Sequence, residues 1–275
     1  MRWDPNPVAF TLPFINLPIY IYGLCFVGGF LLGYFIMIRL LQKTLSKTSP
    51  KDVQVLVDKL TWFTIVGTII GARLGHVIFY DWDRYVSNPF LILNVREGGL
   101  ASHGGTLGVL IALSFFYFFY FKKTGLNFLE LLDHMVIPTA LVAFFIRLGN
   151  FFNQEIVGTP SDSPWAVLFV HPAENNLPVP RHPAQLYEGF CYLLIFGLLM
   201  WLWQKTNIHK KQGFLTGLFF VLVFGSRYMI EFIKEHQHSA LLDQSYLQAG
   251  QILSIPFILL GFFLITRSFY APAKR

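Results

Sequence analysis

The chain has 275 residues, of which 54% are hydrophobic and only 13% are charged, and its formal net charge is +6. A soluble domain would carry about 25% charged residues, so the composition excludes an ordinary soluble fold and indicates a protein that crosses a membrane several times. In such a protein a basic excess marks cytoplasmic loops and anionic head groups, and it is no sign of nucleic-acid binding. The two cysteines, Cys25 and Cys191, lie within apolar runs and predict neither a disulfide nor a metal site.

Seven apolar runs are long enough to cross about 30 Å of hydrocarbon, which takes roughly 20 residues each. The chain is therefore expected to fold as one all-α transmembrane domain over residues 1–275, with an extracytoplasmic loop segment at 153–182. No internal repeat is evident, which disfavours a transporter built from inverted repeats. We expect the membrane-spanning helices over 19–40, 61–80, 103–121, 129–152, 185–203, 213–233 and 248–267.

The distribution of basic residues predicts the orientation of these spans. Cytoplasmic loops of membrane proteins carry an excess of lysine and arginine, so the N-terminus is expected outside and the C-terminus in the cytoplasm. Fewer basic residues fall on the other side, namely Arg2, Arg84, Arg96, Arg181 and Lys234. The larger set follows the odd-numbered spans: Arg39, Lys43, Lys47, Lys51, Lys59, Lys122, Lys123, Lys205, Lys210, Lys211, Arg267, Lys274 and Arg275.

Three arginines, Arg73, Arg147 and Arg227, lie inside the predicted spans. A charged side chain at the middle of a membrane helix costs roughly 2.5–3.5 kcal/mol even on the gentlest scale. Three arginines that each bear this cost indicate that the protein binds an anion. With the orientation above, these arginines and His103 at the start of the third span fall toward the extracytoplasmic half of the bilayer.

Two of the arginines have a polar residue on the same helix face. Arg227 and Glu231 are four residues apart, which allows either an intrahelical ion pair that neutralises both or a carboxylate that orients Arg227 for a substrate. Arg73 and His76 are three residues apart, and a structural role for His76 is favoured over a functional one.

Two segments combine polar residues with glycines. Residues 147–158, RLGNFFNQEIVG, place several polar side chains at the end of an apolar helix, where glycine lets the chain approach a ligand closely. Residues 98–108, GGLASHGGTLG, lack the Gly-Lys-Ser/Thr ending of a phosphate-binding loop, so nucleotide binding is unsupported, and their small residues favour tight helix packing. His103 in this segment suits either a general base or an ordinary hydrogen bond. Tyr22 lies deeper than the usual interfacial anchors.

Several motifs, taken together, resemble the signatures of bacterial prolipoprotein diacylglyceryl transferases in order and spacing, from residues 20–24 to 250–256. The resemblance implies an inner-membrane enzyme with seven spans and an extracytoplasmic active site, without a cofactor or a metal. Its substrates would be phosphatidylglycerol and prolipoproteins: the diacylglyceryl group passes to the thiol of the lipobox cysteine as a thioether, and glycerol phosphate is released. This is the first step of lipoprotein maturation. The motifs are SHGGTLG, RLGNFFNQEIVG, RHPAQLYEG, GSRYMIEF and GQILSIP.

The resemblance also implies roles for individual residues. Arg147 and Arg227 would bind and activate the phosphate, and His103 would take the thiol proton, with Glu155 and Glu231 as alternatives. Val223 stands where the family often has tyrosine, so that hydroxyl is either dispensable or replaced, and Arg73 matches no catalytic position. Tyr22 and Asn150 would position the lipid. The matched functional positions are Tyr22, His103, Arg147, Asn150, Glu155, Gly158, Arg227 and Glu231.

The implied chemistry fits the residue types. Arginine binds phosphate through two parallel hydrogen bonds and stays charged when partly buried. Charge grows on the leaving phosphate oxygen, so preorganised cations stabilise the transition state most, while a cysteine thiol needs a base to become nucleophilic. The alternative is a transporter or channel for an anionic metabolite, with the arginines along its path. A seven-helix retinal protein is set aside because the last span, 248–267, has no lysine.

Overall fold

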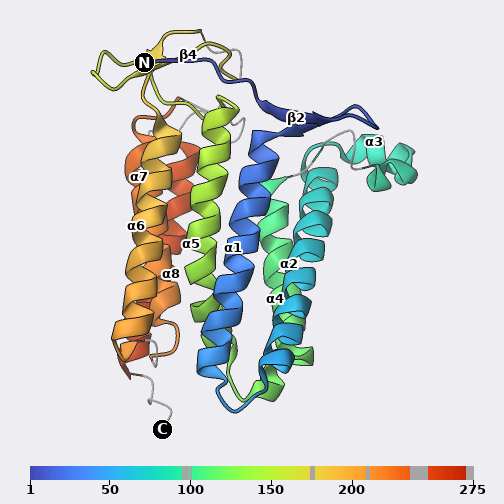
Figure 1. The fold of residues 1–275 in the computed structure, drawn as a ribbon, viewed down its shortest axis with the longest axis vertical. Helices are drawn as coiled ribbons and strands as arrows, with labels where there is room; N and C mark the ends of the chain where they lie inside the picture. Colours follow the sequence, from blue (N-terminus) through green and yellow to red (C-terminus); the bar gives the residue numbers. More distant parts are fainter. Residues whose placement is uncertain (95–98, 100, 174–176, 209–210, 236–246, 271–275) are drawn as a thin grey trace. The chain divides into compact units, whose positions relative to one another are not determined.

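The computed structural model describes residues 1–94, 99, 101–173, 177–208, 211–235 and 247–270, and most of these are helical (Figure 1). The helices are α1 (Ile21–Thr44), α2 (Pro50–Phe79), α3 (Trp82–Ser87), α4 (Ser102–Phe119), α5 (Phe128–Phe152), α6 (Ala184–Lys205), α7 (Phe214–Glu231) and α8 (Ala249–Tyr270), with short 3-10 helices η1 (Pro89–Leu93) and η3 (Phe121–Thr124). The strands are β1 (Arg2–Trp3), β2 (Val8–Leu12), β3 (Leu17–Tyr20), β4 (Val167–Phe169) and β5 (Pro180–Arg181).

The helices confirm an all-α membrane protein that crosses the bilayer several times. Within the described residues, α1, α2, α5, α6, α7 and α8 are long and apolar enough to cross a membrane, and the apolar part of α4, His103–Phe119, is shorter. All seven predicted spans are helices. The boundary that differs most is the start of α2, at Pro50 instead of residue 61, because Ser49 caps the helix by accepting a hydrogen bond from the Asp52 amide and Pro50 occupies the first turn.

The chain divides into two compact units, and the boundaries fall within α1 and within the first turn of α5. The first unit comprises Met1–Ile36 and Leu132–Arg275, and the second comprises Met37–Leu131. Of the residues proposed for the site, only His103 belongs to the second unit.

In the second unit, α2 packs against α4 along glycines on both helices. A side chain at Gly67 would place its Cβ 2.5 Å from the Cβ of Ala112, and one at Gly75 would lie 2.6 Å from the Cα of Gly104. Gly71 and Gly108 are in equally close backbone contact. Gly104 and Gly108 of segment 98–108 therefore serve tight helix packing, as the composition of the segment predicts.

In the first unit, α7 packs on both α6 and α8, and α1 packs on α5 where Gly29 lies under Phe145. The buried carboxylate of Asp133 on α5 fixes the start of α7. It accepts hydrogen bonds from the amides of Gly213 and Thr216 at 2.6 and 2.8 Å, which satisfies donors that a helix N-terminus leaves unpaired.

A small sheet covers the end of α5. Strand β1 pairs with β4 in parallel, and β4 pairs with β5 antiparallel, so the N-terminus and β4 lie together in Figure 1. Trp3 packs beneath this sheet against Phe151 and donates a hydrogen bond from Nε1 to the Phe151 carbonyl at 3.1 Å. The segment 153–182, which the sequence assigns to a loop, contains β4 and β5, and it is anchored at the polar end of α5.

Candidate active site

The side chain of Arg147 is held between α5 and α6, and only 11% of it is exposed. Its Nε lies 2.5 Å from Oε2 of Glu188, and its Nη1 donates a hydrogen bond of 3.0 Å to Oδ1 of Asn150. The Tyr192 hydroxyl lies near the guanidinium and interacts with it electrostatically. The guanidinium is thus held by an ion pair at Nε and by a hydrogen bond at Nη1.

Asn150 connects Arg147 to Glu155. Its Nδ2 donates a hydrogen bond of 2.7 Å to Oε1 of Glu155, and the Glu155 carbonyl accepts one of 2.7 Å from Nε2 of Gln185 on α6. The chain turns sharply here, because Gln154 and Ile156 have φ angles of 54° and 58°. A β-branched residue such as isoleucine rarely adopts this left-handed conformation, so the fold tolerates local strain to aim the Glu155 side chain back at α5.

Glu188 is fully buried and lies between two cations. Its Oε1 is 2.6 Å from Nζ of Lys234, while Oε2 faces Arg147, at ion-pair distances but outside hydrogen-bond angles. Lys234 also donates a hydrogen bond of 3.2 Å to Oε2 of Glu231. Arg147, Glu188, Lys234 and Glu231 thus form a chain of alternating charges, which we call the ion chain.

The partner of Glu231 differs from both interpretations of the sequence. Glu231 pairs with Lys234, three residues later, and not with Arg227. The reason is that the chain leaves α7 at Glu231 and returns Lys234 toward α6, where Glu188 requires a cation. Gly250 of α8 packs directly on the Glu231 carboxylate, where a side chain has no room.

Arg227 on α7 is half-buried, and its charge acts on Tyr192. No hydrogen bond or ion pair joins it to any other residue that the structure describes. It is thus a cation beside the ion chain whose guanidinium is available to an anion.

Tyr22 belongs to the same cluster. Its ring packs on Gly149, where a Cβ would lie 2.7 Å from Cδ2, and its hydroxyl lies within the electrostatic influence of Glu155 and Arg147. The structure therefore brings Tyr22, Arg147, Asn150 and Glu155 together, as the sequence predicts.

Gly158 has a packing role. Its amide donates a hydrogen bond of 2.9 Å to the His182 carbonyl, and Gly158 forms a β-bridge with Lys234. A Cβ at this position would lie 2.6 Å from the His182 carbonyl oxygen and 2.8 Å from that of Ile233. Backbone packing that places Lys234 is sufficient to require glycine, and a direct role of Gly158 in substrate binding stays a prediction.

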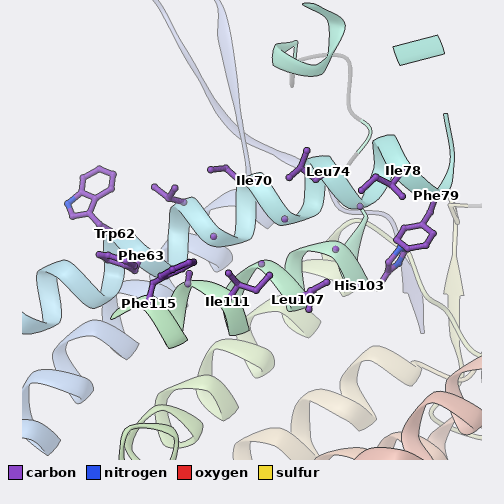
Figure 2. A pocket seen from close by; sticks show the side chains of 17 residues that line it. Trp62, Phe63, Ile70, Leu74, Ile78, Phe79, His103, Leu107, Ile111 and Phe115 are labelled. Carbon is purple, nitrogen blue, oxygen red and sulfur yellow. The ribbon is translucent and has the colours of Figure 1, made fainter. Parts of the chain in front are cut away.

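His103 begins α4 in the second unit, at one end of an apolar groove of about 770 Å³ that runs along α2 and α4 (Figure 2). Its ring is exposed and lies 5.2 Å from the Phe79 ring and 5.8 Å from the Tyr80 ring. Glycines at the α2–α4 contact contribute to the lining of the groove, together with Ile70 and Leu107. An exposed imidazole next to an apolar groove is accessible to a reactant that arrives with hydrocarbon.

Arg73 has a role that the sequence leaves unassigned. It is buried, and it donates hydrogen bonds of 2.6–3.1 Å to the carbonyls of Leu91, Ile92, Asn94 and Gly99. These carbonyls belong to the connection between α3 and α4, so Arg73 organises that connection.

Replacing Arg73 with glutamine is expected to lower the free energy of unfolding by about 2–3 kcal/mol, because four partly buried carbonyls lose charged donors. Thermal unfolding in detergent measures the effect. Arg84→Lys, at an exposed arginine of α3, serves as the control and should leave the midpoint unchanged. Equal midpoints for the Arg73 variant and the unmodified protein would contradict the structural role.

The sequence interpretation missed Glu188, Lys234, Tyr192 and Gln185. Glu188 carries a signal that could have revealed it, because a carboxylate inside an apolar helix is costly unless it has a partner. Lys234 gives no such signal, since it reads as an ordinary basic residue after a span. Among the described residues, no group of three or more His, Cys, Asp or Glu side chains is placed to hold a metal ion.

Comparison with known proteins gives a consistent result. Residues 7–267 match the family described as prolipoprotein diacylglyceryl transferase. The chain is 41% identical to a protein of Protochlamydia amoebophila, with 97% of this chain and 94% of the relative covered. It is 42% identical to one of Tolumonas auensis (97% and 96% covered) and 41% identical to one of Porphyromonas gingivalis (100% and 97% covered). All three are named phosphatidylglycerol–prolipoprotein diacylglyceryl transferase.

Proposed function

The chain belongs to the prolipoprotein diacylglyceryl transferase family, and from this membership we propose that it transfers the diacylglyceryl group of phosphatidylglycerol to prolipoproteins. It is a membrane enzyme of the transferase class. The observation that carries the proposal is the match over residues 7–267, which includes every residue of the ion chain. The acceptor is the thiol of the lipobox cysteine, which becomes a thioether.

The cluster around Arg147 is the phosphate site of this proposal. The cysteine sulfur attacks the carbon of the diacylglyceryl group that is bonded to the phosphate oxygen. The bond between this carbon and the oxygen breaks, and glycerol phosphate leaves with the electron pair. Negative charge grows on the leaving oxygen, and cations fixed in advance stabilise it without reorganisation. Arg147 supplies oriented N–H groups, and Arg227 supplies a charge that no described residue neutralises.

His103 is proposed to accept the thiol proton, with Glu155 and Glu231 as alternatives. Only a neutral imidazole accepts a proton, so the rate of transfer should fall as the pH is lowered. His103→Gln should lower kcat/KM by about 10²–10⁴-fold and abolish this dependence. A pH–rate profile of both proteins measures it, and an unchanged profile would assign the proton to another group.

The location follows the same proposal. The enzyme lies in the bacterial inner membrane, crosses it several times and faces its substrates on the extracytoplasmic side. The bias of basic residues toward the opposite ends of the helices supports this orientation. Reaction of an impermeant thiol reagent with single cysteines introduced at Ser161 and Lys122 in intact cells would test it.

Transfer itself is tested with the purified chain in phosphatidylglycerol vesicles and a lipobox peptide. The peptide should gain one diacylglyceryl group at its cysteine, and the same peptide with serine in place of cysteine should remain unmodified. Absence of product, together with anion flux in sealed vesicles, would instead favour a transporter of an anionic metabolite.

A further inference from the structure

Glu188 is the centre of the ion chain, and no proposal above gives it a role. It is fully buried on α6, and each of its carboxylate oxygens faces a different cation, Arg147 Nε at 2.5 Å and Lys234 Nζ at 2.6 Å. A buried carboxylate without cations is strongly unfavourable, so the fold must supply both. We infer that Glu188, supported by Lys234, is the positioning residue that orients Arg147 for the phosphate; this inference rests on the proposed function.

The geometry of the Arg147 guanidinium supports this role. A guanidinium is a planar fork, and fixing its Nε and Nη1 on different partners determines where its remaining N–H groups point. Glu188 holds Nε, and Asn150 holds Nη1. Because these two partners come from α6 and α5, the fork cannot rotate without breaking one contact.

Helix α6 supplies several of the residues that support Arg147. Gln185, Glu188 and Tyr192 follow one another at helical spacing and share one face. Gln185 binds the Glu155 carbonyl, which places the acceptor for Asn150, while Glu188 and Tyr192 contact Arg147 directly. Helix α6 thus orients Arg147 in two ways, directly through Glu188 and Tyr192 and indirectly through Gln185, Glu155 and Asn150.

The second cation beside Glu188 also affects how strongly Arg147 attracts an anion. A carboxylate paired with Arg147 alone would neutralise it and weaken its attraction for a phosphodiester. Lys234 occupies the other oxygen of Glu188 and also contacts Glu231, so the negative charge of Glu188 is shared. The backbone bridge between Lys234 and Gly158 holds the lysine in place. Arg147 therefore keeps its orientation and a substantial part of its attraction for an anion.

The test is a double-mutant cycle on diacylglyceryl transfer and on phosphatidylglycerol binding in nanodiscs. Glu188→Gln keeps the size of the side chain and removes its charge. It should lower kcat about 10²-fold with a smaller change in KM, since misplacement of a catalytic group acts mainly on the transition state. In the Arg147→Lys variant the planar guanidinium is already absent. Adding Glu188→Gln to that variant should therefore have little further effect on kcat. Binding measurements complete the cycle where turnover is too slow to measure.

Asp133→Asn is the matched control, because Asp133 is another buried carboxylate of the first unit that fixes α7 away from the ion chain. It should lower the thermal midpoint and leave kcat per folded molecule unchanged. If Glu188→Gln does not fold, Glu188→Gln with Lys234→Met removes one charge of each sign and should show the same loss of kcat. Equal losses from Glu188→Gln with and without Arg147→Lys would overturn the inference. Failure of the unmodified protein to transfer would overturn the proposed function instead.

Discussion

Replacing Arg147 with alanine is expected to reduce the rate of diacylglyceryl transfer by about 10³-fold. Removal of one preorganised donor from a developing oxyanion costs about 10²–10³-fold, and loss of an arginine that stabilises a phosphate in the transition state costs 10³-fold or more. Transfer of labelled diacylglyceryl to a lipobox peptide measures the effect. Near-normal turnover in a well-folded variant would remove Arg147 from the phosphate site.

The same substitution should also destabilise the fold. Glu188 would keep only Lys234, and removal of one partner of a buried ion pair typically costs about 3–5 kcal/mol. Thermal unfolding in detergent must therefore accompany the assay, and rates must be expressed per folded molecule. Arg147→Lys is the control: it keeps a charge near Glu188 but loses the fork, so it should recover much of the stability and little of the activity.

Replacing Arg227 with glutamine is expected to lower kcat/KM by about 10²-fold, with little change in stability. The physical reason is the difference between the two arginines. Arg147 has a carboxylate partner that its loss would leave with one cation fewer, whereas Arg227 forms no ion pair with a described residue. Replacing Arg227 therefore removes a positive charge that would bind the substrate. It leaves no carboxylate of a described residue without its cation.

The two properties are measured separately, by the transfer assay at several phosphatidylglycerol concentrations and by thermal unfolding. Arg73→Gln is the opposite control, since that arginine serves the connection between α3 and α4 and should affect stability. An Arg227 variant that unfolds much earlier yet transfers normally would show that Arg227 is structural.

The distinction between these arginines illustrates what could be predicted. From the sequence, Arg73, Arg147 and Arg227 are equivalent charges in apolar helices, and the family motifs separate only the last two from the first. The contacts of Arg73 with four carbonyls arise from residues roughly twenty positions later in the chain, in a connection that contains the short 3-10 helix η1. No local pattern encodes that proximity.

The sequence by itself determined the class of the fold, the positions of the helices, and the family. These are local properties: an apolar run of sufficient length must form a helix in a bilayer, because only internal hydrogen bonds can satisfy its backbone. The family resemblance also named Tyr22, Arg147, Asn150 and Glu155, whose side chains lie close together in the structure. Only the tertiary structure decided the partners of the buried charges. In it, Glu231 forms an ion pair with Lys234, and Glu188 lies between Lys234 and Arg147. A buried charge must be compensated by whatever helix packing brings within a few ångströms, and that distance depends on the whole fold.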